Sequence, residues 1–260
     1  MYETIKYDLT DSIATITIDR PENANALNAK MAEELFDASV RCTHDGVRAV
    51  IVTAKGKLFC GGGDLAEFDE AGDNRAAMLT RMATILHGSL IRFAHMDAPV
   101  IMAVNGTAGG GGFSMALSGD YVIASDRAKF ISAYTASGLT PDGSSTYFLA
   151  KHVGLLRAKE LMFTNRLLTA EEAKDWGIVN KVVPGEDLMD EAQKMARFFA
   201  DGPTLAFGGL KSLLNTAYSD SMESQLERET RSIAGMMGTY DGPHGVNAFL
   251  HKQKPVFKGE

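Results

Sequence analysis

Four consecutive glycines, Gly109 to Gly112, constrain the fold of this sequence more than any other feature. The residues before them, Pro99 to Val104, are apolar and lie between a proline and an Asn-Gly pair, which is typical of a buried strand. The residues after them, Phe113 to Leu117, are apolar enough to form a buried helix. Because glycine loses more backbone entropy on folding than any other residue, we infer that the run allows something to approach the backbone closely. A helix that begins there would offer free N–H groups to an oxyanion or a phosphate, although tight packing of the helix against a strand would equally favour glycine.

The composition and the charge restrict the class of protein. A chain of 260 residues with 45% hydrophobic and 23% charged residues suits one large domain, or one domain with a helical appendage. Its net charge of −7 gives no general attraction to nucleic acids or acidic membranes, so we expect neither as a partner. Cys42 and Cys60 are the only cysteines, which indicates a reducing compartment. The first residues contain no basic region followed by an apolar run, and we therefore expect a cytoplasmic protein.

The first hundred residues predict a strand, a glycine loop and a helix, in an order that the next segment repeats. Alternating residues predict a hairpin over 4–19, and Asn28 is placed to cap a following helix. Residues 49–53 form a second apolar strand, which leads into Gly61-Gly62-Gly63. Apolar residues at helical spacing predict a helix over 75–95, directly before the strand described above.

The remainder alternates between short strands and helices. The sequence predicts short strands at 121–125 and 128–132, a helix at 144–152 and a last strand at 178–183. Thr169 and Glu172 have the spacing of a capping box. From residue 186 onward the pattern is helical, with interruptions at 202–203 and 238–243.

Common nucleotide, metal and hydrolase motifs match this sequence poorly. Residues 61–66 fit G-x-G-x-x-A formally, but no acidic residue closes a strand about twenty positions later, as ribose recognition requires. We expect no metal, because histidine and cysteine residues do not cluster at ligand spacing. Ser114 is one glycine short of a nucleophile elbow and falls inside the expected helix, which disfavours a serine hydrolase.

Two glycine loops in one chain suggest that two backbone N–H groups converge on a single oxygen. Such a pair stabilises the enolate or tetrahedral oxyanion of a thioester. With both loops in place, the sequence resembles the crotonase family, also called the enoyl-CoA hydratase/isomerase family. The resemblance covers essentially the whole chain and is carried by Phe59–Leu65, Asn105-Gly106, Gly110–Gly112, Asp120, Ala128–Phe130, Gly138–Leu149, Leu161–Trp176 and Phe249–Lys252.

The resemblance implies a fold, a ligand and an assembly. The expected fold is α/β, a spiral of strand-strand-helix units followed by a helical C-terminal trimerisation region. Residues 1–200 would form the acyl-CoA-binding core and residues 201–260 the oligomerisation region of a homotrimer or a dimer of trimers. The substrate would carry coenzyme A, and no cofactor would be bound permanently.

The resemblance also implies site residues. The oxyanion donors would be the N–H groups of Gly63 and Gly111. Phe249 and Lys252 would reach the CoA of a neighbouring subunit, which would supply local positive charge. The remaining CoA-binding positions lie in two segments: Asn25, Ala26, Leu27, and Gly61, Asp64, Leu65, Ala66.

One departure from the family concerns the acid and base. A hydratase uses two glutamates to position and activate water, and this chain has Ser114 and Tyr134 at those positions. Without the glutamates, hydration of a simple 2-enoyl-CoA lacks a visible acid–base pair. We expect Ser114 and Tyr134 to line the acyl pocket instead.

Asp142 is the remaining candidate for the chemistry, with His87 beside it. Asp142 lies in a Gly-Leu-x-Pro-Asp-Gly context that resembles ring-epoxide and enoyl-CoA isomerases, where the carboxylate moves a proton between carbons. The same position carries the nucleophile of 4-chlorobenzoyl-CoA dehalogenases, which use a histidine matching His87 as base and a tryptophan where this chain has Tyr134. We favour the isomerase; the alternatives are a dehalogenase, a hydratase of low activity, or a CoA-binding protein without catalysis. By position alone, Asp142 could be a helix cap and His87 a packed side chain.

Overall fold

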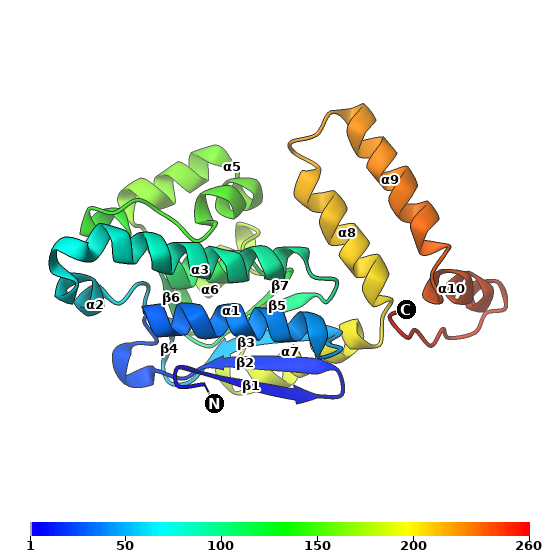
Figure 1. Ribbon diagram of the computed structural model, residues 1–260, viewed down its shortest axis with the longest axis horizontal. Helices are drawn as coiled ribbons and strands as arrows, with labels where there is room; N and C mark the ends of the chain where they lie inside the picture. The colour runs from blue at the N-terminus through cyan, green and yellow to red at the C-terminus, as the bar shows by residue number, and fades with distance from the viewer. Residues whose placement is uncertain (1) are drawn as a thin grey trace.

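A six-stranded sheet forms the centre of the computed structural model, which describes residues 2–260. The first two strands form the predicted antiparallel hairpin, and every other pairing in this sheet is parallel. In spatial order the strands are β1 (Ile5–Thr10), β2 (Ile13–Ile18), β3 (Ala49–Ala54), β5 (Val100–Val104), β7 (Tyr121–Ser125) and β10 (Lys181–Val183) (Figure 1).

The two central strands are apolar because helices cover both faces of the sheet. Every residue of β3 and β5 is buried, as expected for parallel strands packed on both sides. Val50 and Val52 face the core beneath α1 (Ala29–His44) and α3 (Arg75–His95). Ala49 and Ile51 face the opposite core, beneath α7 (Leu188–Ala200).

A second sheet of short strands lies beside the first. Its order is β4 (Leu58–Cys60), β6 (Thr107–Gly109), β8 (Lys129–Ile131) and β9 (Leu168–Thr169). Three of these strands directly follow β3, β5 and β7 in the chain, and each then leads into a helical segment. The α-helices that follow are α2 (Leu65–Glu70), α4 (Gly111–Leu117) and α5 (Ser145–Thr164), the last after a short 3-10 helix. The expected spiral of strand-strand-helix units is therefore confirmed.

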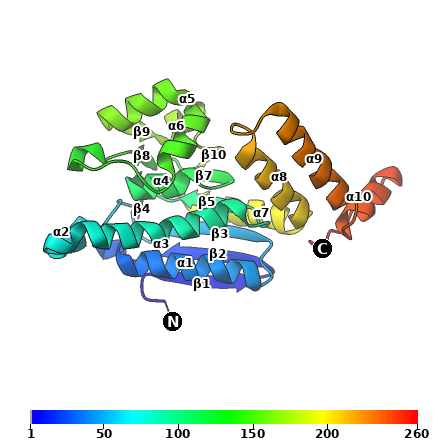
Figure 2. The same ribbon diagram turned by 45° about the horizontal axis from the view of Figure 1, so that its top comes forward.

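The C-terminal helices extend away from the two sheets. Figures 1 and 2 both show α8 (Thr204–Thr216), α9 (Met222–Met236) and α10 (Asp241–Leu250) as an arm on the side of the core opposite α2. The ammonium group of Lys211 fastens α8 to the core: it donates to Phe93 O at 2.8 Å and pairs with Asp120 Oδ2 at 2.7 Å. The other helical elements are α6 (Ala170–Asp175) and the short 3-10 helices Pro21–Asn23, Gly72–Asn74, Thr135–Ser137 and Gly185–Asp187.

Several sequence predictions are confirmed and others need correction. Asn28 caps α1, the helix over 75–95 has the predicted bounds, and Thr169 and Glu172 form a capping box. The helix predicted to end at residue 152 continues to Thr164, with a break at Gly154, where φ is +77°. The last strand begins at residue 181 instead of 178.

In the C-terminal region the prediction missed one break between helices and found another. Residues 217–221 separate α8 from α9, although the pattern there reads as continuous helix. The interruption predicted at 238–243 is confirmed at residues 237–240, between α9 and α10, and Pro243 lies in the first turn of α10, where its missing N–H costs no helical hydrogen bond. None of the helices in residues 2–260 has the length and apolar character that crossing a bilayer requires.

Candidate active site

The two glycine loops lie against each other where β4 and β6 of the second sheet end. A Cβ on Gly62 would lie 3.3 Å from the carbonyl oxygen of Gly109, and φ of Gly62 is +112°. A Cβ on Gly112 would lie 2.4 Å from the carbonyl oxygen of Cys60, inside van der Waals contact. Part of the glycine run therefore serves close packing, which was one of the two readings of the sequence.

Two backbone N–H groups in these loops remain available to a ligand. Gly111 is the first residue of α4, so its N–H has no acceptor within the helix. Among the hydrogen bonds of residues 2–260, none uses the N–H of Gly63, although its neighbour Asp64 donates to Leu27 O at 2.8 Å. Gly63 and Gly111 line the same cavity, and such donors can stabilise negative charge on a ligand oxygen.

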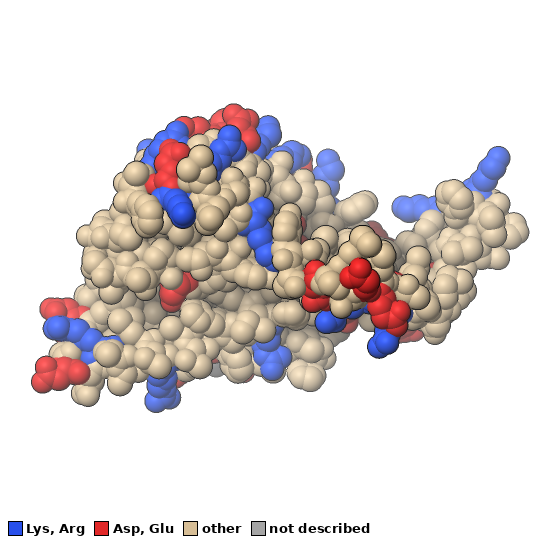
Figure 3. All heavy atoms as spheres, turned by 90° about the horizontal axis from the view of Figure 1, so that it is seen from above, with Lys and Arg blue, Asp and Glu red and all other residues tan. Residues whose placement is uncertain are grey.

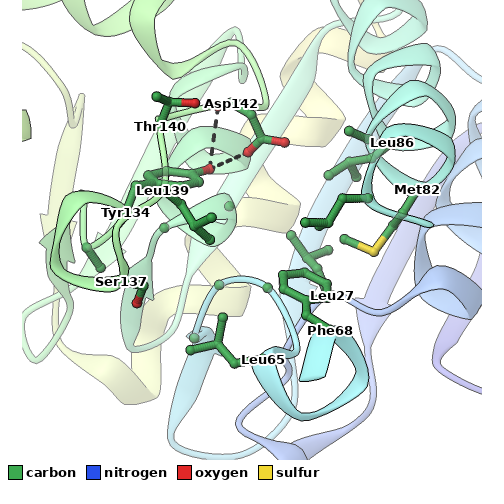
Figure 4. Close-up of a pocket in the computed structure, with 18 residues that line it drawn as sticks. Leu27, Leu65, Phe68, Met82, Leu86, Tyr134, Ser137, Leu139, Thr140 and Asp142 are labelled. Carbon is green, nitrogen blue, oxygen red and sulfur yellow. Dashed lines mark hydrogen bonds between the residues drawn. The ribbon is translucent and has the colours of Figure 1, made fainter. Parts of the chain in front are cut away.

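This cavity has a volume of about 260 Å³ and is mostly apolar. Figure 4 shows Met82 and Leu86 of α3 on one side and Leu139, Tyr134 and Asp142 on the other. Among the described residues that line it, Asp142 is the only one with a charged side chain. Figure 3 shows a hollow across the face seen from above, with mainly uncharged residues around it and scattered basic side chains. An apolar cavity with one carboxylate suits a hydrophobic group that reacts at a single point.

The carboxylate of Asp142 is held by two side chains. The Tyr134 hydroxyl donates to Oδ1 at 2.6 Å, and His87 Nε2 lies 3.3 Å from Oδ2 (Figure 4 shows the tyrosine bond). The carboxylate does not cap α5, because Ser144 occupies the cap position and only the backbone carbonyl of Asp142 accepts from Ser145. The side chain of Asp142 is thus free of the capping role that position alone suggested.

Ser114 and Tyr134 form one connected group with Asp142. Ser114 Oγ lies 2.9 Å from the Tyr134 hydroxyl and donates to the carbonyl oxygen of Asp142 at 2.9 Å. Burial, and then the charge of Asp142, raise the pKa of Tyr134, so its hydroxyl keeps the proton that it donates. Tyr134 lines the cavity as expected, but Ser114 is fully buried behind it. The placement of Ser114 in the acyl pocket needs correction, because α4 turns that side chain into the core.

His87 is close to Asp142 but borders a different cavity. Its Nε2 accepts the N–H of Gly143 at 3.1 Å as well as facing the carboxylate. The ring lines a second cavity of about 380 Å³ between α3, α5 and α8. The sequence analysis predicted that His87 lies beside Asp142, but it did not indicate the second cavity.

The positions expected to bind CoA have different roles in the structure. Leu27, Gly61 and Leu65 line the cavity. Asn25 is fully buried, and its amide bonds to Arg20 N, Lys55 O and Leu58 O, so its side chain joins its own loop to the segment from the end of β3 to the start of β4.

Of the other positions expected to bind CoA, Asp64 and Ala26 are bonded within the protein, and Ala66 is exposed. Asp64 caps α2 and pairs with Arg20 at 3.2 Å. Arg20 also donates to the carbonyl oxygen of Ala26 at 2.6 Å, and Ala66 lies exposed on the surface of α2. Contact between these segments and CoA stays a prediction.

Phe249 and Lys252 lie far from the cavity of their own chain. Phe249 is on α10 and is 82% exposed, and Lys252 follows the end of that helix. Figures 1 and 2 place α10 at the far end of the C-terminal arm. Contact with the CoA of a neighbouring subunit stays a prediction.

Several cavity residues were not identified from the sequence. Phe68 of α2 packs on the glycine loop, because a Cβ on Gly63 would lie 2.7 Å from its ring. Leu79 and Leu86 on α3 belong to an apolar pattern that marks core and cavity faces alike. Ser137 and Thr140 come from a loop without periodicity, and only the resemblance pointed to that region.

The fold and the glycine-lined cavity define an α/β protein of the crotonase class, and comparisons with known proteins agree. The family described as enoyl-CoA hydratase/isomerase matches residues 8–260. A 1,2-epoxyphenylacetyl-CoA isomerase of Escherichia coli (strain K12) is 36% identical over 264 residues, with 100% of both chains covered. A 4-chlorobenzoyl coenzyme A dehalogenase of Arthrobacter sp. is 34% identical, with 90% of this chain and 86% of the relative covered.

Solved structures lead to the same family. The crystal structure of an enoyl-CoA hydratase from Bacillus anthracis superposes with a TM-score of 0.92 at 31% identity, covering 99% of this chain and 100% of the other. The chain belongs to the enoyl-CoA hydratase/isomerase family. It is thus an acyl-CoA enzyme by family, as the resemblance implied.

Proposed function

We propose that this protein isomerises an enoyl-CoA or a ring-epoxide acyl-CoA, with Asp142 as the acid and base. One observation carries the proposal: Asp142 is the single charged side chain on a cavity that Gly63 and Gly111 also line. A thioester oxygen that accepts both N–H groups would stabilise the enolate formed when a neighbouring C–H bond breaks. The likeness to a 1,2-epoxyphenylacetyl-CoA isomerase supports the same reaction class.

The proton transfer needs only one carboxylate. Asp142 takes the proton as the electron pair of the C–H bond enters the enolate, and then returns it to a different carbon as the double bond shifts. With a ring-fused epoxide as substrate, the Asp142 carboxyl group would donate a proton to the ring as it opens or take one from it. The thioester itself accepts the electron pair, so we propose a reaction without a permanently bound cofactor.

Hydration is disfavoured at the same place. The two positions that carry glutamates in hydratases have Ser114 and Tyr134, whose hydroxyls bond to each other and to Asp142. No second carboxylate lines the cavity among the described residues, so a water molecule would lack a separate base. Hydratase activity, if measured on a 2-enoyl-CoA, should be low.

Hydrolytic dehalogenation of an aryl-CoA is the second candidate. Its support is the 3.3 Å contact between His87 and Asp142 and the likeness to a 4-chlorobenzoyl coenzyme A dehalogenase. Asp142 would attack the ring carbon, and His87 would activate the water that cleaves the ester. Against it, Oδ1 is already bonded to Tyr134 at 2.6 Å, which weakens the carboxylate as a nucleophile. Chloride release from 4-chlorobenzoyl-CoA measures this reaction directly.

An Asp142→Asn variant tests the proposal against a CoA-binding protein without catalysis. We expect it to bind the acyl-CoA but to lose isomerisation by about 10²-fold or more, as expected when an acid–base group is removed. Asp69→Asn is the matched control, because Asp69 lies on the surface of α2 and pairs only with Arg75. Equal rates for wild type and Asp142→Asn would contradict the catalytic assignment.

We propose that residues 1–200 bind the acyl-CoA and that residues 201–260 join three copies, alone or as a dimer of trimers. Large apolar side chains on the arm are exposed, which favours contact with another subunit. They include Leu214, Tyr218, Met222, Ile233, Phe249 and Leu250. Sedimentation of the full chain would measure the assembly, and a monomer would contradict it.

The same assembly would let Phe249 and Lys252 reach the CoA of a neighbouring subunit. Lys252→Ala should then weaken CoA binding without changing the chemical step. Lys254→Ala, two residues further along the same exposed tail, is the matched control.

A further inference from the structure

His87 and its neighbour Asp142 border two different cavities. Asp142 lines the acyl cavity and not the second one, and His87 lines the second cavity and not the first. The second cavity is bordered by apolar Leu90, Ile91 and Phe148 and by polar His95, Tyr147 and Asn215. Asp142 and His87 therefore form a contact of 3.3 Å that joins two separate spaces.

The lone pair of His87 Nε2 lies between two partners, the N–H of Gly143 and the carboxylate of Asp142. Nε2 accepts the N–H of Gly143 at 3.1 Å, which requires a free lone pair and places the proton of the neutral ring on Nδ1. Oδ2 of Asp142 then faces a second acceptor at 3.3 Å. Nε2 has one lone pair, so it takes up a proton from Asp142 only by giving up the N–H of Gly143, and Asp142 lies near enough for that exchange of partners.

We propose that His87 relays protons between Asp142 and water in the second cavity, so that the transferred proton exchanges with solvent during turnover. This inference rests on the proposed role of Asp142 in isomerisation. His87 touches no reacting atom and acts through Asp142.

The relay balances as two proton transfers in each direction. Breaking the substrate C–H bond leaves its electron pair in the enolate and its proton on the Asp142 carboxyl group. The carboxyl O–H passes that proton to Nε2, which gives up its hydrogen bond from the N–H of Gly143, and the imidazolium releases its Nδ1 proton to water. Nδ1 makes no hydrogen bond within residues 2–260 and so remains available to water. The reverse transfers bring a solvent proton to Asp142, which delivers it to the product carbon.

The two cavities explain why proton exchange with solvent would need His87. The side chains of Asp142 and His87 are each 40% exposed. An acyl group in the first cavity would cover Asp142 and expel its water, whereas the second cavity stays open to His87. Solvent exchange through Asp142 alone would then be slow while substrate is bound.

The test follows deuterium in the product of single turnovers in heavy water. Wild type, His87→Gln and His95→Gln are compared on a 3-enoyl-CoA, and the deuterium at the newly protonated carbon is measured by mass spectrometry at low conversion. Glutamine can accept the N–H of Gly143 but cannot take up a second proton. His95 is the matched control, since it lies two turns further along α3, borders the same cavity and does not contact Asp142.

We expect most of the product made by wild type and by the control His95→Gln to carry deuterium. In His87→Gln the deuterated fraction of the product should fall by at least about tenfold. This is a smaller effect than the roughly 10²–10⁴-fold that a positioned acid–base group contributes to proton transfer. The protium removed from the substrate should then reappear at the new carbon. An unchanged deuterated fraction in His87→Gln would overturn the relay, even if the rate falls, because a merely structural histidine would slow turnover without changing this fraction.

The outcomes for the two proposals are distinguishable. Wild type that isomerises but carries no deuterium overturns the relay and leaves the role of Asp142 intact. Wild type that neither isomerises nor exchanges protons, or Asp142→Asn with full activity, overturns the proposed function first. Loss of deuterium in His95→Gln equal to that in His87→Gln would also overturn the relay.

Discussion

The hydroxyl of Tyr134 donates a 2.6 Å hydrogen bond to Oδ1 of Asp142. This bond fixes one carboxylate oxygen and leaves the other, Oδ2, facing His87. The tyrosine hydroxyl is itself 2.9 Å from buried Ser114 Oγ. Ser114 and Tyr134, at the two positions expected to hold hydratase glutamates, therefore form a hydrogen-bonded group that holds the carboxylate of Asp142.

Replacing Tyr134 by phenylalanine should reduce kcat more than it changes KM. The variant keeps the ring on the cavity wall but frees the carboxylate, and a displacement of about 1 Å costs about 10²-fold in rate. Steady-state kinetics on the isomerisation substrate measure the two constants. The matched control is Tyr218→Phe, on a tyrosine that is 79% exposed on the C-terminal arm. A raised KM with unchanged kcat would show that Tyr134 binds substrate instead.

Tyr134 should stay protonated at pH 10, the ordinary pKa of a tyrosine. Burial and the charge of Asp142 raise its pKa, which moves loss of the proton to higher pH, so the bond to Asp142 survives at pH 10. The difference in ultraviolet absorbance between wild type and Tyr134→Phe isolates this residue. Tyrosinate absorbance in that difference at or below pH 10 would contradict the prediction.

Gly112→Ala should destabilise the protein by about 1–3 kcal/mol, the range expected for overpacking. The added Cβ would lie 2.4 Å from Cys60 O and 2.6 Å from Cys60 Cβ, so the two glycine loops must separate. Gly235→Ala is the matched control, because a Cβ there meets nothing within 4 Å and lies on α9. That control should be neutral or stabilising by about 0.5–1 kcal/mol. Chemical denaturation measures both, and equal stability of the two variants would argue against close loop packing.

Lys211→Met should weaken the attachment of α8 to the core. It removes the partner of Asp120 and the donor to the carbonyl oxygens of Phe93 and Ala98. Loss of one member of a buried pair costs about 3–5 kcal/mol, and the low end fits here because the Asp120 side chain is 26% exposed.

The double variant separates the charge from the packing. In Lys211→Met with Asp120→Asn the uncompensated carboxylate is absent, and part of the lost stability should return. Chemical denaturation of the three variants gives the coupling. A double variant as unstable as the sum of the single variants would show that the two side chains act independently.

The sequence predicted the long, periodic elements of the fold well. The strand at β5, the helix over Arg75–His95 and the capping box at Thr169 follow from patterns that depend on local spacing. In the second sheet the strand predicted at 128–132 is confirmed as β8, but its other strands have only two or three residues, too few to show alternation, and were missed. The break in α5 at Gly154 was missed because a single glycine is compatible with a helix.

The candidate site was predictable in part. The glycine loops could be found from composition, and Asp142 and His87 from their likeness to family members. The position of Ser114 behind Tyr134 and the second cavity beside His87 depend on how α4, α3 and α8 pack. Such tertiary arrangements leave no periodic signal in one sequence. Asn25 shows the same limit, because no pattern in the sequence indicates that its amide bonds to Arg20, Lys55 and Leu58.

The most direct test of the account measures deuterium uptake from heavy water into the carbons of a 3-enoyl-CoA. Wild type and Asp142→Asn are incubated in parallel with the thioester and analysed by mass spectrometry, after binding of the thioester to both has been confirmed. We expect uptake with wild type and none above background with Asp142→Asn, because the carboxylate is the group that breaks the C–H bond. Uptake that persists in Asp142→Asn, or a wild type that binds the thioester but neither isomerises it nor takes up deuterium, would contradict the assignment of Asp142 as the base of an enolate-forming isomerase.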